Sequence, residues 1–148
     1  MVHHVCVEII IMLLVSWKGN FQKGKVSILS FGFNQVGDVD GNVPGIHAEH
    51  AAINKLKPSY RKKRLQTINL LVIRISKNNK LQSSKPCTIC IQNMKTLPEK
   101  KGYKIKNIYY SNNDGDIVKS NFQILEKEEQ HLSRFYRRQK YNNYKNWI

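Results

Sequence analysis

Cysteine is scarce in this chain, and its three copies do not suit a disulfide scaffold. Disulfide-stabilised domains carry a denser and even set of cysteines, whereas here Cys87 and Cys90 form a Cys-x-x-Cys pair and Cys6 stands alone in an apolar run. We interpret the pair as metal ligands in a reducing compartment and Cys6 as a small core residue. The sequence therefore predicts an intracellular, cytoplasmic protein, with the nucleus left open.

Acidic residues and long apolar runs are also lacking. The chain has 10 Asp and Glu against 25 Lys and Arg, a net charge of +15. Such a surface attracts the phosphates of a nucleotide, a nucleic acid or an anionic membrane; the alternative is coding bias in a chain crowded with Asn and Lys. The apolar run at 9–15 is too short to span a bilayer and lacks the flanks of a signal peptide. We expect no membrane association.

The length and composition indicate one globular domain. A chain of 148 residues with 41% hydrophobic residues can bury a single core, and no internal repeat or second-domain boundary is visible. We expect the domain to cover residues 1–131, with a basic, aromatic tail at 132–148. Nothing in the sequence fixes the oligomeric state, so a homo-oligomer remains open.

The order of expected elements predicts an α/β fold. Residues 5–17 fit either a first strand or a first helix, because periodicity does not separate short apolar runs. The apolar centre of 67–75 indicates a central strand buried on both faces, and the Asn112–Gly115 turn predicts an antiparallel hairpin. We expect a three-layer sandwich with a mixed sheet of about five strands flanked by helices. The other expected strands are 26–33, 104–111 and 116–120, and the expected helices are 48–56, 87–97 (ended by Pro98) and 122–140.

Two short stretches carry the chemistry, His47-Ala48-Glu49 and Pro86-Cys87-Thr88-Ile89-Cys90. Two thiols three positions apart at a helix start can hold one side of a metal ion, and the positive helix N-terminus favours thiolates there. His47 supplies a third ligand and leaves a fourth position for water. Glu49 is too close along the chain to be a comfortable ligand, but it is well placed to handle the proton of that water.

These residues match the H-x-E…P-C-x-x-C signature of zinc-dependent base deaminases, and the chain resembles the cytidine and deoxycytidylate deaminase superfamily over roughly residues 26–120. The resemblance implies a zinc ion held by His47, Cys87 and Cys90, with Glu49 as the catalytic proton shuttle. It further implies that Asn34 holds the sugar of the substrate. By the same resemblance, the backbone at Ala48, Ser84 and Lys85 contacts the base.

Two features of the resemblance point to different substrates. Free-cytidine deaminases typically have cysteine at the position of His47 and a glutamate soon after that of Asn34, so the His-Ala-Glu form is closer to nucleotide and polynucleotide deaminases. The expected hairpin instead matches the free-nucleoside branch. We expect a zinc-dependent hydrolytic deaminase of a cytosine-type nucleoside or nucleotide. The alternatives are a deaminase of a base within RNA or single-stranded DNA and a non-catalytic zinc module.

Less specific interpretations accompany both the motifs and the tail. His50 as a fourth ligand would make a closed structural zinc site, and a redox Cys-x-x-Cys lacks a thioredoxin-like context. Interleaved basic and aromatic residues in the tail can track a single nucleic-acid strand, or they can form a core-packing helix face with a solvated edge. The tail residues concerned are Arg134, Arg137, Arg138, Lys140 and Lys145 with Phe135, Tyr136, Tyr141, Tyr144 and Trp147.

Overall fold

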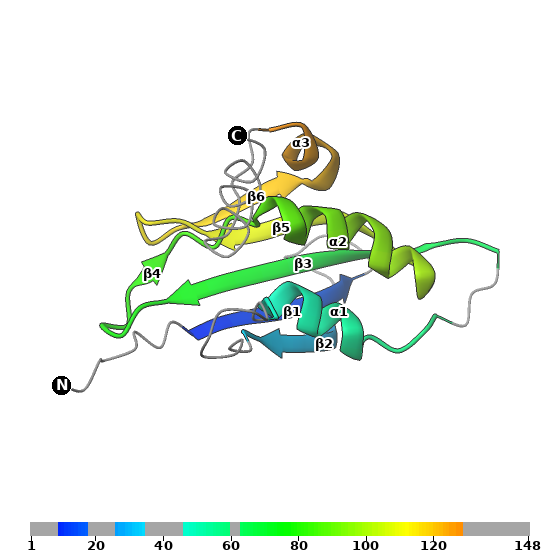
Figure 1. Ribbon diagram of the computed structural model, residues 1–148, viewed down its shortest axis with the longest axis horizontal. Helices are drawn as coiled ribbons and strands as arrows, with labels where there is room; N and C mark the ends of the chain where they lie inside the picture. Colours follow the sequence, from blue (N-terminus) through cyan, green and yellow to red (C-terminus); the bar gives the residue numbers. More distant parts are fainter. Residues whose placement is uncertain (1–8, 18–25, 35–45, 60–62, 129–148) are drawn as a thin grey trace, which may run out of the picture.

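A mixed sheet with helices packed on it forms the described part of the chain (Figure 1). The structure is a computed structural model that describes residues 9–17, 26–34, 46–59 and 63–128. Its strands are β1 (Ile9–Trp17), β2 (Val26–Phe33), β3 (Gln66–Ile75), β4 (Leu81–Gln82), β5 (Tyr103–Ser111) and β6 (Ile117–Asn121). Its helices are α1 (Ala48–Lys55), α2 (Thr88–Lys100) and α3 (Phe122–Lys127).

The strands lie in the order β2-β1-β3-β5-β6, and the two-residue β4 pairs with the end of β3. The β3–β5 pair is parallel and the others are antiparallel. Parallel neighbours need a crossover connection, and α2 provides it. The α/β class with a mixed sheet is thus confirmed for the described residues.

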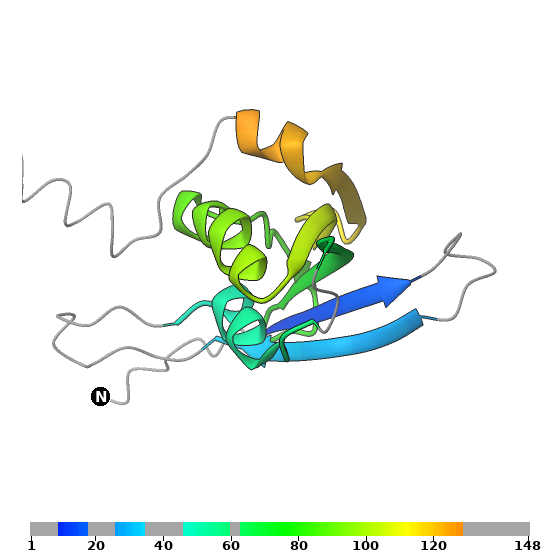
Figure 2. The same ribbon diagram turned by 90° about the vertical axis from the view of Figure 1, so that its right-hand side faces the viewer.

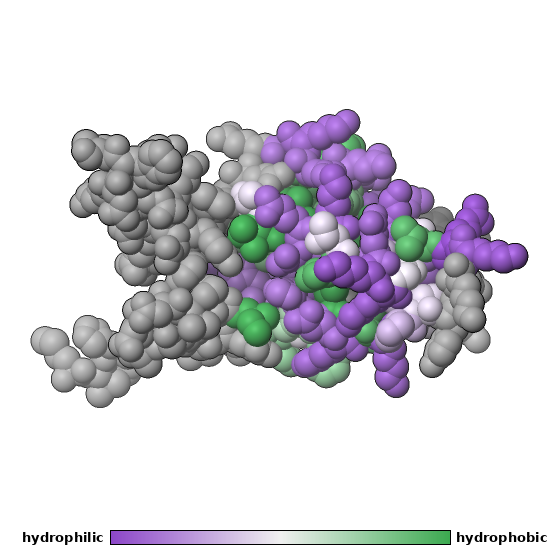
Figure 3. Space-filling model, turned by 45° about the vertical axis from the view of Figure 1, so that its right-hand side comes forward, coloured by the Kyte–Doolittle hydropathy of each residue, from purple (hydrophilic) through white to green (hydrophobic). Residues whose placement is uncertain are grey.

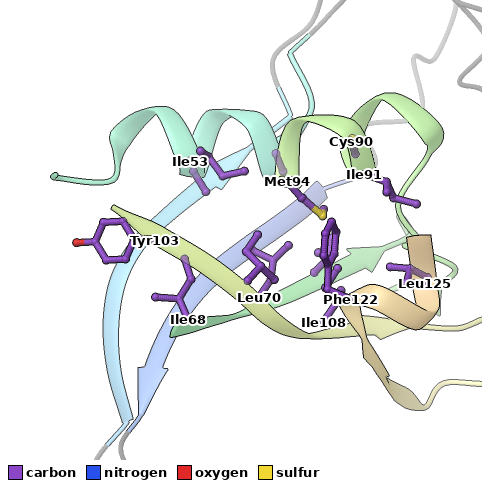
Figure 4. Packing of buried hydrophobic residues seen from close by; sticks show 14 of the residues in the cluster. Ile53, Ile68, Leu70, Cys90, Ile91, Met94, Tyr103, Ile108, Phe122 and Leu125 are labelled. Atoms are coloured by element: carbon purple, nitrogen blue, oxygen red, sulfur yellow. The ribbon is translucent and has the colours of Figure 1, made fainter. Parts of the chain in front are cut away.

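The three described helices share one face of the sheet (Figure 2). Ile68, Leu70 and Val72 of β3 point into a single core with residues of all three helices, and Met94 extends from α2 toward the sheet in Figure 4. On the opposite face of β3, Leu71 and Ile73 are only half-buried. The described residues therefore form two layers, and the expected second helical layer is not seen among them. The second face of β3 is only partly buried, since Asn69 on that face is 6% exposed.

The ambiguous first segment is a strand at 9–17. It pairs antiparallel with β2 on one side and with β3 on the other, so its backbone groups are used by two neighbours. The first two strands of the chain are therefore direct neighbours in the sheet. Periodicity does not reveal strand partners, so the sequence alone does not distinguish a strand from a helix at 5–17.

Helix α1 lies against β2 at unusually close range. A Cβ atom at Gly32 would lie 2.5 Å from the Ala52 backbone nitrogen and 2.6 Å from the Ala48 carbonyl oxygen. The Ser30 hydroxyl donates to the Ala52 carbonyl oxygen over 2.8 Å. Glycine and alanine at this crossing let the helix backbone approach the strand, which fixes where α1 begins.

The other ends of α1 and α2 are joined by Lys101. Its ammonium donates to the carbonyl oxygens of Ile53, Asn54 and Leu56 at 2.9, 2.6 and 2.8 Å. The last carbonyls of a helix lack intrahelical partners, and a cation there also complements the helix dipole. One side chain therefore holds the two helices together at the end opposite the metal motifs.

The expected hairpin is confirmed, because β5 and β6 pair antiparallel. The Asn112 side-chain oxygen accepts hydrogen bonds from the backbone N–H groups of Asp114 and Asp116 at 3.0 and 2.9 Å. Gly115 adopts φ +86°, a conformation that favours glycine. The turn predicted from the sequence at Asn112–Gly115 is therefore the turn that closes the hairpin.

Two expected helix ends are wrong. Helix α2 continues past Pro98 to Lys100, because a buried proline in the last turn removes only one helical hydrogen bond. Helix α3 ends at Lys127, and Glu128 already has extended backbone angles. The rest of the expected helix at 122–140 and the tail at 132–148 lie outside the described residues.

The described surface is mainly hydrophilic on the face that Figure 3 presents, with separate hydrophobic patches rather than one large one. This agrees with a chain of net charge +15. Within the described ranges, no helix combines the length and the apolar character needed to cross a membrane.

Candidate metal centre

His47 occupies the N-cap position of α1 with an extended backbone. Its side chain caps no helical N–H group; instead, the Asn34 side-chain oxygen accepts the Ala48 N–H at 2.9 Å. Because the imidazole is not used as a helix cap, it is available for other partners. The loop residue after β2 thus orients the first residue of the metal motif.

Cys87 is the N-cap of α2, and Cys90 lies in the first turn of that helix. Both side chains are buried, 5% and 2% exposed. Pro86 precedes them, a residue that suits the start of a helix because its missing N–H is not needed there. The positive end of the helix dipole lies at this position, where it stabilises negative charge on sulfur.

The two helix starts bring three ligand atoms together. The Nδ1 atom of His47 lies 2.9 Å from Cys90 Sγ and 3.6 Å from Cys87 Sγ, and the three atoms lie within 4.8 Å of one another. In a tetrahedral zinc site the nitrogen and sulfur ligands lie about 3.6 Å apart, given the usual Zn–N and Zn–S bond lengths. His47, Cys87 and Cys90 are positioned to hold a metal ion, and a set of one imidazole and two thiolates is compatible with zinc.

Hydrogen bonds among the two thiols and the imidazole shift the pKa values of all three groups. A hydrogen bond from Cys90 lowers the pKa of Cys87 to about 4, and the same bond together with burial raises the pKa of Cys90. The hydrogen bond to Cys87 raises the pKa of His47. A bound metal replaces these protons, so metal affinity is expected to fall as the pH falls.

Glu49 lies in the first turn of α1 and is buried, 6% exposed, although it is ionisable. Burial raises its pKa, partly offset by hydrogen bonds from its own backbone N–H and from Cys90. Its carboxylate is not a member of the three-ligand cluster. A buried carboxyl group beside a metal site and outside the ligand set is suited to taking and returning a proton.

His50 does not join the cluster among the described residues. Its Nδ1 atom lies 3.5 Å from the Asn93 side-chain nitrogen of α2 instead. The geometry therefore offers three protein ligands rather than a closed set of four, as a site with an open position requires.

The four residues expected to contact substrate do not share one role. Asn34 and Ala48 are joined by a hydrogen bond at the start of α1. The Ser84 side chain is buried and donates to the Val72 carbonyl oxygen over 2.8 Å. The Lys85 ammonium lies 3.0 Å from the Glu128 carboxylate. The structure thus places Asn34 and Ala48 beside His47, while the Ser84 and Lys85 side chains support the segment before Cys87.

Ser111 is the residue that sequence reasoning missed. It ends β5, is fully buried and hydrogen-bonds with the segment that leads to Cys87. A serine at the end of a strand is an ordinary sequence feature, and no spacing or motif marks it.

Replacing Cys87 with alanine should abolish metal binding while leaving the fold intact, because the loss of one of three ligands removes a strong thiolate bond. Metal analysis of protein purified without chelator should find about one zinc per chain in the unmodified protein and far less in Cys87→Ala. His50→Ala is the matched control and should retain the metal. Unmodified protein without metal, or loss of zinc in His50→Ala, would contradict this assignment.

Comparison of the sequence with protein-family models and with curated proteins found no match, so the metal centre is assigned from its own residues.

Proposed function

We propose that the protein is a zinc-dependent hydrolytic deaminase acting on a cytosine-type nucleoside or nucleotide. The observation that carries the proposal is the position of Glu49, a buried carboxyl group beside a three-ligand cluster of His47, Cys87 and Cys90. This is the set of groups that base deamination uses, in the H-x-E…P-C-x-x-C order of zinc-dependent deaminases. A cytidine deaminase-like fold is part of the same proposal.

The reaction replaces the exocyclic amine of the ring with an oxygen atom from water and releases ammonia. Zinc, when bound, lowers the pKa of a coordinated water toward neutrality. Glu49 accepts a proton from the attacking water and delivers it to the ring nitrogen. It then takes the remaining proton from the hydroxyl group added to the ring carbon and passes it to the exocyclic amine, which departs as ammonia while the carbonyl forms. Its raised pKa supports this role, because a carboxyl group that both takes and gives a proton works best when its pKa approaches the working pH.

The β5–β6 hairpin supports a small substrate. Its antiparallel pairing agrees with the free-nucleoside branch of the family that the sequence resembles. The net charge of +15 supports a substrate that carries phosphate, either a nucleotide or, as a second candidate, a base within RNA or single-stranded DNA. A non-catalytic zinc module receives less support, because His50 lies outside the cluster.

A panel assay for ammonia release tests the proposal. It compares cytidine, deoxycytidine, their monophosphates, the free bases and a single-stranded oligonucleotide, for the full chain and for a chain without residues 132–148. We expect release from a cytosine-type monomer by both forms. Release from the oligonucleotide alone, lost with the tail, would favour the second candidate. No release from any substrate by zinc-loaded protein would favour the non-catalytic module.

A further inference from the structure

The segment just before Pro86 is attached to the β5–β6 hairpin by its backbone. The Ser83 N–H donates to the Asn113 side-chain oxygen over 2.9 Å, and the Ser84 N–H donates to the Ser111 carbonyl oxygen over 2.9 Å. The β5–β6 hairpin therefore fixes this segment, although the hairpin comes later in the sequence than the segment.

Ser111 provides the buried part of this attachment. Its hydroxyl donates to the Gln82 carbonyl oxygen over 2.7 Å and accepts the Arg74 N–H at 3.0 Å. Its backbone N–H donates to the Ser84 hydroxyl oxygen over 2.8 Å, and that hydroxyl donates to the Val72 carbonyl oxygen. Ser111 is 0% and Ser84 7% exposed. Buried hydrogen bonds of this kind restrict position strongly, because a broken partner is not replaced by water.

A short, stiff connection carries this restriction to the metal ligand. Only Lys85 and Pro86 separate Ser84 from Cys87, and Pro86 is fully buried with a fixed φ. On the other side of the segment, Lys85 forms an ion pair with Glu128 after α3. The position of Ser84 therefore determines where α2 begins and where the Cys87 sulfur lies relative to His47.

We infer that Ser111 is a positioning residue for the metal centre, acting through Gln82 and Ser84 on Cys87. It touches no metal ligand, and its role is to hold the ligand loop in the geometry that the metal requires. Residues that orient metal ligands from outside the ligand set typically change metal affinity by about 10–100-fold when removed. The inference rests on the metal centre of the proposed function but not on the reaction.

Ser111→Ala is the test, with Tyr103→Phe as its matched control. Tyr103 begins the strand that Ser111 ends, and its hydroxyl donates to the Lys57 carbonyl oxygen over 2.9 Å, far along β5 from the metal ligands. Each variant removes one hydroxyl from the same strand. Zinc affinity would be measured by competition with a chromophoric chelator, at a temperature where circular dichroism shows both variants to be folded. We expect Ser111→Ala to bind zinc about 10-fold more weakly or worse, and Tyr103→Phe to change affinity less than about twofold.

A second readout uses the metal-free chain. Loosening of the segment should expose Cys87, so its alkylation rate, followed by peptide mapping, should rise in Ser111→Ala and not in Tyr103→Phe. Should Ser111→Ala fail to fold, Asn113→Ala removes only the hydrogen bond from Ser83 at the exposed turn and should still weaken zinc binding severalfold. Equal zinc affinity of the unmodified protein and the folded serine variant, or of Asn113→Ala in its place, would overturn the inference. Absence of deaminase activity with this pattern intact would overturn only the proposed function.

Discussion

Glu49→Gln should retain its zinc and its fold while losing nearly all turnover. Glutamine has the size and shape of glutamate, so the buried site of α1 keeps its packing. It does not carry a proton between water, ring and amine, and loss of general acid–base catalysis typically lowers kcat by about 10²–10⁴-fold. Ammonia release on the best substrate of the panel, together with metal content, measures both expectations on the same preparation.

Glu126→Gln is the control for Glu49→Gln. Glu126 lies on α3 and forms an ion pair with Lys95, away from the metal ligands, so the same change of charge there should leave turnover unaltered. Loss of zinc from Glu49→Gln would make Glu49 a ligand rather than a proton carrier, and the structural zinc site would become the better interpretation.

Gly32→Ala should disturb the metal centre from the side of α1 that contacts β2. The added Cβ would meet backbone atoms of Ala48 and Ala52 at 2.6 and 2.5 Å, and backbone does not rotate away as a flexible side chain would. Helix α1 must shift, and it carries His47 and Glu49 at its first turn. We expect a loss of about 1–3 kcal/mol in the free energy of unfolding, measured by urea denaturation. Zinc affinity should also fall, by about 10-fold or more.

Gly102→Ala separates a local shift from general destabilisation. Gly102 has φ +86° just after α2, and an added Cβ would meet only Ser59, 3.1 Å from its Cβ, so alanine there is strained at the end of α2 opposite the metal motifs. The strain costs about 1–2 kcal/mol. We expect this variant to lose stability while keeping its zinc affinity. If Gly32→Ala also kept its affinity, the close contact with β2 would not determine the position of His47.

The sequence predicted the long strands better than it predicted the short strand β4 and the helices that cover the sheet. The bounds expected for the second strand, 26–33, are those of β2, because β-forming residues there end at a Gly-Phe-Asn terminus. Strand β4 was missed, because two residues held only by their pairing with β3 leave no periodic pattern. Tertiary packing also decides which elements cover each face of the sheet. The described helices all pack on one face.

The metal ligands were predictable and their supports were not. His47, Cys87 and Cys90 belong to short motifs whose chemistry restricts residue type and spacing, and the structure brings them together. The contact of the Ser84 backbone with a base stays a prediction, but no motif indicated that its hydroxyl donates to the Val72 carbonyl oxygen and accepts from the Ser111 N–H. Hydrogen bonds between residues far apart in the sequence follow from the fold, and a single sequence carries no sign of them.

The anchors of the Cys87 segment have a consequence for the order of assembly during synthesis. Ser111, Asn113 and Glu128 all follow the three metal ligands in the sequence, so a growing chain presents His47, Cys87 and Cys90 before their supports exist. Until β5 has joined β3 in parallel pairing, the segment before Pro86 has its contacts with β3 but lacks the support of Ser111 and Asn113, and parallel pairing of distant strands is a slow step in folding. A newly made chain should therefore capture its metal firmly only near the end of folding, after the hairpin has docked.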